Sequence, residues 1–332
     1  MASTHHILQS RPNPNLISIV IPCYNEEAVV PILRERITEF MKVLPCPAEI
    51  ILVNDGSADQ TINLLWKWAE TDQRIKVIGF ARNFGHQPAV TAGMDVAEGD
   101  AVVIIDADLQ DPLEVILEML KKYCDGYDIV YGQREERTGE STFKLLTAWF
   151  FYRIMRKLVH KDLPVDAGDF RLIARDALDT LKSMREMHRF LRGMGAWVGF
   201  AQCPVVYKRA ARVAGETKYP LSKMLKFAWT AAVSFSAFPL RLSLGLGIVV
   251  AIFGFMAGIY AIIQAVLHFL NTNPSQVYNP GWATLVTLLC LIGGAILICL
   301  GILGEYVGRI FEEIKARPLY IIRCSKNVTL PK

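Results

Sequence analysis

The chain has 332 residues, and its hydrophobic fraction of 52% and mean hydropathy of +0.28 are high for a soluble protein. The net charge of +4 is too small to indicate a nucleic-acid partner, although it fits a domain that lies on an anionic membrane surface. The seven cysteines show no C-x-x-C pair and no metal-ligand spacing, so we expect reduced thiols without a disulfide framework.

Short β-branched runs alternate with amphipathic stretches between about residues 16 and 132. The expected strands cover residues 16–21, 49–53, 75–79, 101–105 and 128–131, and the expected helices cover residues 29–43, 60–71, 87–97 and 113–123. The strands are continuously apolar rather than alternating, as in sheets that are buried on both faces. The pattern therefore predicts an α/β domain, with a mostly parallel sheet and helices on both faces.

Polar segments follow each of the first four expected strands. They read PCYNEE from Pro22, NDGS from Asn54, ARNFG from Ala81 and DADLQDP from Asp106. Since the carboxyl ends of parallel strands meet at one edge of a sheet, where open α/β folds bind ligands, we expect one site of nucleotide size. The chain has no G-x-G-x-x-G motif and no P-loop, which argues against a dinucleotide-dependent dehydrogenase.

Three carboxylates crowd the end of the fourth expected strand. Asp106 and Asp108, a D-x-D pair, fall on the same side of an extended segment, where both can reach one divalent cation. The alternative is helix capping, which we assign to Asp111 because Pro112 can begin the next helix. Capping needs one acid and not three, so we favour a metal site for Asp106 and Asp108.

Residues 141–159 and 221–238 carry aromatic, leucine and basic residues at helical spacing. Such stretches can be ordinary amphipathic helices that pack on a core. Their basic ends and clustered aromatic residues favour helices that lie in a membrane interface.

Residues 242–267 and 282–304 contain no charged residue, and each run can cross a hydrocarbon layer of about 30 Å. Lys and Arg flank the pair on its outer sides, at positions 223, 226 and 241 and at positions 309, 315, 317 and 323. The connecting loop, residues 268–281, has no Lys or Arg. The positive-inside rule then predicts a multi-pass protein whose large N-terminal part and C-terminal tail are both cytoplasmic.

The first 15 residues lack the apolar core of a signal peptide, so we expect the N-terminal domain not to be exported. The expected organisation follows the chain. It has a polar tail (1–15), a catalytic domain (16–220), an interfacial helix (221–240), a two-helix transmembrane domain (241–304) and a C-terminal tail (305–332).

Read in order, PCYNEE, VNDGSADQT, ARNFGHQ and DADLQDP resemble the motifs of family 2 glycosyltransferases with the GT-A fold. The later segments AGDFRLIARD, RFLRGMGAWVG and R-x-x-GETKYP, followed by two spans, narrow the resemblance to polyisoprenyl-phosphate glycosyltransferases. The chain is most similar to the bactoprenol (undecaprenyl-phosphate) glucosyltransferases of O-antigen modification, and more distantly to dolichol-phosphate mannose synthases. The resemblance covers residues 16–322, and the order and spacing of these motifs make it specific.

The resemblance implies a UDP-sugar donor, with glucose the best guess for the sugar, Mg²⁺ or Mn²⁺, and polyprenyl (undecaprenyl) phosphate as acceptor. It places the enzyme in the bacterial inner (cytoplasmic) membrane as a homo-oligomer, a tetramer in relatives. The implied nucleotide-binding residues are Pro22, Tyr24, Glu26, Asp55, Arg82 and Asp106. The implied metal ligands are Asp106, Asp108 and Gln110. Many relatives have Asp at the position of Asn54, so the role in base binding is kept on Asp55. Asp55 can also be a simple turn residue, and Arg82 a surface arginine.

On the acceptor side, the candidate phosphate-binding residues are Arg134, Arg209, Arg212 and Lys218. For Arg209, a solvated surface charge is the alternative. Asp169 joins Asp108 as a catalytic candidate because relatives place a carboxylate at its position. Asp169 can instead pair with Arg171 or Arg175, or order the acceptor loop. A phosphate dianion needs little help from a base, so we expect Asp169→Asn to cost much less than Asp108→Asn.

Two other readings compete with this one. A processive polysaccharide synthase shares the D-x-D site, but it carries Q-x-x-R-W and usually more spans, whereas this chain has RGMGAW from Arg192. A non-catalytic membrane scaffold or lipid transporter fits poorly, because transporters bury ionisable residues in their helices. Only Gln264 interrupts the first span. Other sugars, such as N-acetylhexosamine, mannose or aminoarabinose, stay open.

Overall fold

The computed structural model describes residues 8–135, 167–208, 238–270 and 281–329. The chain divides into two compact units, one made of Met1–Lys226 with Arg317–Lys332 and the other of Phe227–Ala316. The interfacial helices expected at 141–159 and 221–238 lie outside the described residues.

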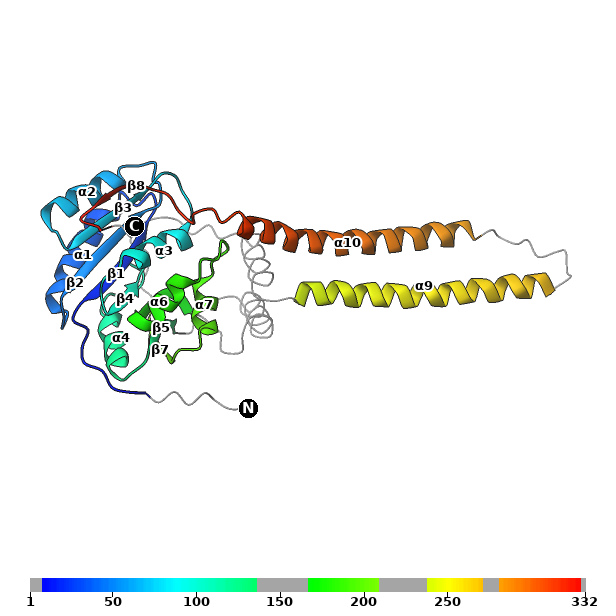
Figure 1. Cartoon of the computed structure of the whole chain (residues 1–332), viewed down its shortest axis with the longest axis horizontal. Helices are drawn as coiled ribbons and strands as arrows, with labels where there is room; N and C mark the ends of the chain where they lie inside the picture. The colour runs from blue at the N-terminus through cyan, green and yellow to red at the C-terminus, as the bar shows by residue number, and fades with distance from the viewer. Residues whose placement is uncertain (1–7, 136–166, 209–237, 271–280, 330–332) are drawn as a thin grey trace. The chain divides into compact units, whose positions relative to one another are not determined.

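The first unit is built on an eight-stranded sheet of order β7-β5-β6-β4-β1-β2-β3-β8. Its strands are β1 (Ile17–Cys23), β2 (Ala48–Asn54), β3 (Ile75–Phe80), β4 (Ala101–Ile104), β5 (Ile129–Arg134), β6 (Ala167–Ala174), β7 (Gln202–Tyr207) and β8 (Ile322–Lys326). The neighbours β4, β1, β2 and β3 are mutually parallel, and β5 runs parallel to β7. The prediction of a mostly parallel sheet is therefore confirmed. Two antiparallel strands were not predicted, namely β6 between β4 and β5, and β8 at the edge beside β3. Figure 1 shows β8 beside β3.

Helices cover both faces of this sheet. They are α1 (Val30–Val43), α2 (Thr61–Thr71), α3 (His86–Val96), α4 (Val115–Cys124), α6 (Arg175–Ser183) and α7 (Leu191–Trp197). Ile17, Ile19 and Ile21 of β1 share one core with side chains of α1, α2 and α4. Successive strand residues point to opposite faces, so Val20 faces the other side, where α3 packs on β1. A Cβ atom on Gly93 of α3 would lie 2.2 Å from Val20 Cγ1, and only glycine permits this approach.

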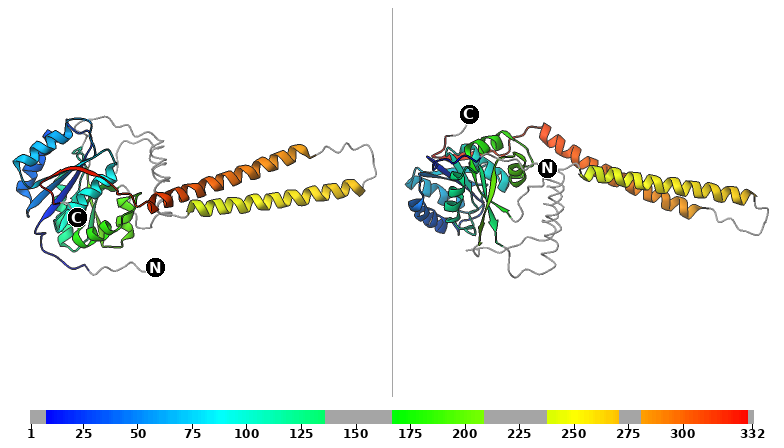
Figure 2. Two further views of the ribbon diagram at one scale, coloured as in Figure 1. Left: turned by 45° about the horizontal axis from the view of Figure 1, so that its top comes forward. Right: turned by 90° about the horizontal axis from the view of Figure 1, so that it is seen from below.

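The second unit is a pair of long helices, α9 (Phe238–Leu270) and α10 (Trp282–Ile314). They run side by side as a hairpin (Figures 1 and 2). Leu240–Tyr260 and Leu291–Ile314 are long and apolar enough to cross a membrane, which confirms the two expected apolar helices. Helix α10 continues ten residues beyond the predicted end of the second span at position 304.

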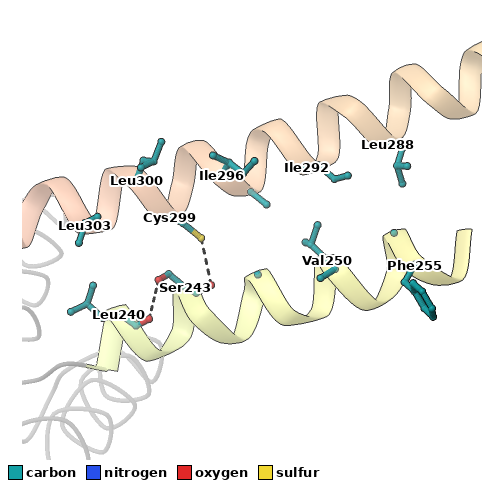
Figure 3. Close-up of a pocket in the computed structure, with 14 residues that line it drawn as sticks. Leu240, Ser243, Val250, Phe255, Leu288, Ile292, Ile296, Cys299, Leu300 and Leu303 are labelled. Carbon is teal, nitrogen blue, oxygen red and sulfur yellow. Dashed lines mark hydrogen bonds between the residues drawn. The ribbon is translucent and has the colours of Figure 1, made fainter. Parts of the chain in front are cut away.

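Residues of α9 and α10 line an apolar cavity of about 810 Å³ that lies between the two helices (Figure 3). Its walls are mainly leucine, isoleucine and small side chains, and Gly247 and Gly254 contribute from α9. Near one end, Cys299 Sγ donates a hydrogen bond to the carbonyl oxygen of Ser243 at 3.5 Å. The hairpin is thus held mainly by apolar contacts.

Candidate active site

The loops that follow β1, β2 and β3 are tied together by hydrogen bonds at one edge of the sheet. The backbone N–H of Asn25 donates to Ser57 Oγ at 3.0 Å, and the N–H of Ala58 donates to Asn25 Oδ1 at 2.9 Å. The N–H of Glu26 donates to Thr61 Oγ1 at 2.8 Å. The polar segments that follow the predicted strands therefore do gather at the carboxyl ends of the parallel strands.

Asp55, at the end of β2, fastens the loop after β3. We call residues 81–85 the donor loop. The Asp55 carboxylate accepts hydrogen bonds from Asn83 Nδ2 at 3.0 Å and from the N–H groups of Phe84 and Gly85 at 2.7 and 2.9 Å. Burial raises the pKa of Asp55, and the N–H groups of Phe84 and Gly85 oppose that rise. Asp55 is thus a clamp between two loops and more than a simple turn residue.

Gly56 lets these two loops approach closely. It has φ of +64°, and a Cβ atom there would lie 2.3 Å from the carbonyl carbon of Arg82. A side chain at position 56 would therefore push the donor loop away from Asp55.

The remaining nucleotide-binding candidates lie on the same loops. Pro22 is in β1, paired with Val53 of β2, and the side chain of Tyr24 is 48% exposed just beyond that strand. An exposed aromatic ring there can stack on a base. The Arg82 guanidinium lies 4.0 Å from the centre of the Phe84 ring and donates to the Asn83 carbonyl oxygen at 3.0 Å.

The expected metal ligands follow β4 directly. Leu109 has a positive φ of 55°, which turns the chain sharply between Asp108 and Gln110, and Asp108 Oδ1 accepts the Gln110 N–H at 3.2 Å. Burial raises the pKa of Asp106; His86 opposes that rise, and the carboxylates of Asp169, Asp111 and Asp108 add to it. Two carboxylates and one amide are oxygen donors of the kind that Mg²⁺ and Mn²⁺ prefer, so these residues fit such an ion. No group of three His, Cys, Asp or Glu side chains suited to a metal occurs in the described ranges.

Asp111 does not cap the following helix, contrary to the prediction. Helix α4 begins at Val115, two residues later than expected, and Glu114 occupies its N-cap position. Asp111 is buried and instead accepts a hydrogen bond from the Tyr207 hydroxyl group. Tyr207 belongs to β7, a strand that was not predicted. Its hydroxyl group is therefore a hydrogen-bond donor to Asp111 that the sequence analysis could not anticipate.

Asp169 lies beside this acidic cluster because β6 is antiparallel to β4. Ile104 is paired with Arg171, so the chain two residues past β4 reaches the position opposite Asp169. Arg192 Nε donates to Asp169 Oδ1 at 2.9 Å, and His86 Nε2 lies 3.2 Å from Asp169 Oδ2. Gln87 Nε2 also donates to Oδ2, at 3.2 Å.

The charges around Asp169 keep it ionised. Burial alone would raise its pKa, but Arg192 and His86 hold the pKa of this carboxyl far below its usual range. Of the alternative partners expected from sequence, Arg171 donates its hydrogen bonds to the carbonyl oxygens of Leu191 and Gly168, although its charge also helps to lower the pKa of Asp169. Arg175 donates to the carbonyl oxygens of Ala97 and Gly99. A carboxylate with so low a pKa is a weak base.

His86, Gln87 and Arg192 are the site residues that the sequence analysis missed. His86 Nε2 lies 3.7 Å from Asp106 Oδ1 as well as near Asp169, so it bridges the acidic cluster and the second carboxylate. Gln87 Oε1 accepts the N–H of Leu191 at 3.1 Å, which joins α3 to α7. His86 and Gln87 belong to the ARNFGHQ motif and begin α3. Their place just after the end of a predicted strand could have marked them as site residues.

Only part of the expected acceptor site can be placed. Arg134 ends β5, and a Cβ atom on Gly168 would lie 3.1 Å from its Nη2 atom, so a larger residue at 168 would crowd this guanidinium. Arg209, Arg212 and Lys218 lie outside the described residues.

The chain is similar in sequence to known glycosyltransferases over most of its length. Residues 18–182 match "Glycosyl transferase family 2", and residues 238–310 match the "GtrB C-terminal hairpin". The uncharacterized glycosyltransferase YkcC of Bacillus subtilis is 46% identical over 94% of both chains. The bactoprenol glucosyl transferase of Shigella phage SfII is 39% identical over 93% of this chain and 98% of its own length. Among solved structures, glucosyl-3-phosphoglycerate synthase from Mycobacterium tuberculosis matches with a TM-score of 0.45 and 19% identity, over 66% of this chain and 76% of that chain.

Proposed function

The chain belongs to glycosyl transferase family 2 and carries the GtrB C-terminal hairpin, and from this premise we propose that it glycosylates a lipid phosphate. The donor is a UDP-hexose, with glucose the best candidate, and the acceptor is undecaprenyl phosphate. Relatives named bactoprenol glucosyl transferase, 39% identical over 93% of this chain, support the acceptor and the sugar. The product is a lipid-monophosphate-linked sugar for modification of cell-surface glycans.

One observation carries the proposal. The acidic segment after β4 stands against Asp169 of β6, with His86 between the two carboxylates at 3.7 and 3.2 Å. A transferase for two anionic substrates needs such a mixed cluster, since it must hold a departing diphosphate and an incoming phosphate together.

On the donor side, we assign the nucleotide to the loops that Asp55 fastens. The exposed ring of Tyr24 offers a stacking surface for the base, and Pro22 and Glu26 flank it. Arg82 supplies a cation for the diphosphate. Asp106, Asp108 and Gln110 would hold Mg²⁺ or Mn²⁺, which when bound acts as a Lewis acid that stabilises charge on the leaving diphosphate.

On the acceptor side, Arg134 with Arg209, Arg212 and Lys218 binds the lipid phosphate. A phosphate monoester has its second pKa near 6, so the acceptor is mostly dianionic at pH 7 and needs little activation. Asp169, with its low pKa, serves mainly to hold His86 and Arg192 in place. A phosphate oxygen attacks the anomeric carbon as the bond to the diphosphate breaks, and this single displacement inverts the configuration. An α-linked sugar nucleotide then gives a β-linked lipid product.

The two apolar helices support a reaction at a membrane. We propose that both α9 and α10 span the bacterial inner membrane and that the catalytic unit and both termini face the cytoplasm. The absence of Lys and Arg from residues 268–281 supports this orientation. The glycines of the hairpin permit close helix contact, which supports a homo-oligomer.

The test is a transfer assay with a panel of labelled sugar nucleotides. Membranes that contain the protein are incubated with UDP-glucose, UDP-N-acetylhexosamine, GDP-mannose or an aminoarabinose donor, and the lipid fraction is extracted. We expect label from UDP-glucose in a lipid monophosphate, with the β configuration by NMR. An α product would contradict single displacement.

Two further outcomes separate the competing functions. Label in long glycan chains would identify a processive polysaccharide synthase. No label from any donor would favour a membrane scaffold. Undiminished transfer in excess chelator would refute the metal site.

A further inference from the structure

The chain that follows the second membrane helix returns to the catalytic sheet. Helix α10 ends at Ile314, and eight residues later β8 pairs antiparallel with β3, with Phe80 opposite Ile322 (Figure 1). The Ala81 N–H donates to the carbonyl oxygen of Ile321 at 3.0 Å, so the pairing continues to the first residue of the donor loop. The sequence pattern suggested only a tail in this region.

Tyr320 makes the main contacts at this junction. Its ring stacks on that of Phe80, with centroids 5.2 Å apart and an interplanar angle of 10°. Its hydroxyl group donates to Asp95 Oδ2 of α3 at 2.6 Å. Arg185 donates to both oxygens of the same carboxylate, at 2.9 and 2.8 Å. Tyr320 is thus joined to β3 through its ring and to α3 through its hydroxyl group.

These two elements bracket the donor loop. Phe80 is the last residue of β3, and its ring packs edge-on against that of Phe84, with centroids 5.6 Å apart. Helix α3 begins at His86, immediately after the loop, and His86 reaches Asp106 and Asp169. A shift of β3 relative to α3 would therefore change the position of Phe84 relative to His86.

We infer that Tyr320 is a positioning residue for the nucleotide-sugar site, because it fixes β3 and α3 on either side of the donor loop. The inference rests on the proposed function, in which Arg82 and Asp55 of this region serve the donor. It gives the segment after the second membrane helix a role in donor binding. Five residues separate Ile314 from Tyr320 along the chain.

The other end of β8 offers a matched control. Asn327 donates from Nδ2 to the carbonyl oxygens of Ala69 and Ile75, at 2.8 and 2.9 Å. Ile75 is the first residue of β3, at the opposite end of that strand from the donor loop. Asn327→Ala should therefore weaken the edge strand without moving the loop.

The experiment compares Tyr320→Ala, Tyr320→Phe and Asn327→Ala in the full chain, reconstituted in lipid nanodiscs. Hydrogen exchange at the Phe84 and Gly85 amides, which donate to Asp55, reports the loop without any substrate. Steady-state kinetics then give KM separately for UDP-glucose and for undecaprenyl phosphate.

We expect Tyr320→Ala to speed exchange at both amides and to raise the donor KM, each by about 10-fold, because it loses both the stacking on Phe80 and the hydrogen bond to the Asp95 carboxylate. The acceptor KM should stay unchanged. Tyr320→Phe keeps the ring stacking, so its effects should be smaller but in the same direction. Asn327→Ala should lower the unfolding temperature and leave exchange and donor KM as in the parent.

Two results would overturn the inference. One is unchanged exchange and donor KM in both Tyr320 variants. The other is an equal rise in both quantities for Asn327→Ala, which would make β8 a general stabiliser of the sheet. If exchange changes as expected but the parent transfers no sugar, the positioning role stands and the proposed function fails.

Discussion

The two units of this protein place their apolar side chains in opposite ways. In the sheet unit, Ile19 and Val103 are 0% exposed. In the hairpin, Phe253 is 67% exposed and Leu297 is 71% exposed. A chain that folds in water cannot leave two such helices uncovered, whereas lipid covers them without cost. The first unit carries its own core, and the second needs a bilayer to complete it.

The two units also differ in which of them carries the residues of the candidate site. The carboxylates, arginines and His86 that form the candidate site all belong to the sheet unit. The candidate span Leu240–Tyr260 contains a single charged residue, Arg241, near its start. In the proposed function, the hairpin provides the location and the sheet unit provides the reaction. Each prediction below tests one side of that division.

The largest effect is expected from Asp108→Asn, which removes charge from the proposed metal site. We expect the transfer rate to fall about 1,000-fold, as for loss of a group that stabilises transition-state charge. The measurement is formation of labelled glycolipid. Glu114→Gln is the control, because Glu114 is exposed nearby and forms an ion pair with Arg36 at 3.4 Å, away from the acidic cluster. Retention of a tenth of the activity by Asp108→Asn would argue against the metal site.

Truncating a large aliphatic side chain to alanine should lower the free energy of unfolding by different amounts in the two units. Ile19→Ala leaves a cavity in a packed core and should lower the free energy of unfolding by about 3 kcal/mol. Leu297→Ala exchanges a lipid-exposed side chain and should cost less than about 1 kcal/mol. Urea unfolding followed by tryptophan fluorescence can report the sheet unit, since Trp68 is buried there. Equal losses would mean that Leu297 faces a protein partner and not lipid.

Asp169→Asn should be a milder change than Asp108→Asn. Its carboxylate has a strongly lowered pKa and is paired with Arg192, so it orders the site more than it removes a proton. We expect a loss of about 10-fold in transfer, below the range for a lost general base. Asparagine keeps an oxygen that can accept the Gln87 hydrogen bond. A loss as deep as that of Asp108→Asn would restore the catalytic-base role.

The smallest effect is expected within the hairpin. Cys299→Ala removes the 3.5 Å contact to the Ser243 carbonyl oxygen. Such contacts contribute about 0.6 kcal/mol on average in membrane helices, and a thiol is a weak donor. The unfolding temperature and the transfer rate in nanodiscs should both stay close to those of the parent. A large fall in transfer would show that the hairpin takes part in the reaction and would break the division between the units.

Local patterns were sufficient for much of the fold. The parallel strands β1 to β4, the helices between them and the two membrane helices all follow from runs of apolar residues at strand or helix spacing. The polar segments after each strand also gave the edge of the sheet that holds the site. Such features depend on neighbours in sequence, which a single chain displays directly.

The contacts within the site needed the tertiary structure. Nothing near Asp169 in sequence shows that β6 runs antiparallel beside β4, yet that register sets Asp169 opposite the acidic segment. The separation between Gln87 and Asp169 is 82 residues, and that between Tyr320 and Asp95 is 225.

The sequence by itself therefore determined the parallel core of the sheet, the two long apolar helices, the family and the type of chemistry, because burial period and motif order are local properties. Only the tertiary structure decided that His86 and Arg192 hold Asp169, that Tyr207 takes Asp111, and that Tyr320 reaches α3. Those pairings depend on strand order and direction, which hydrogen bonds between distant segments fix only when the sheet assembles.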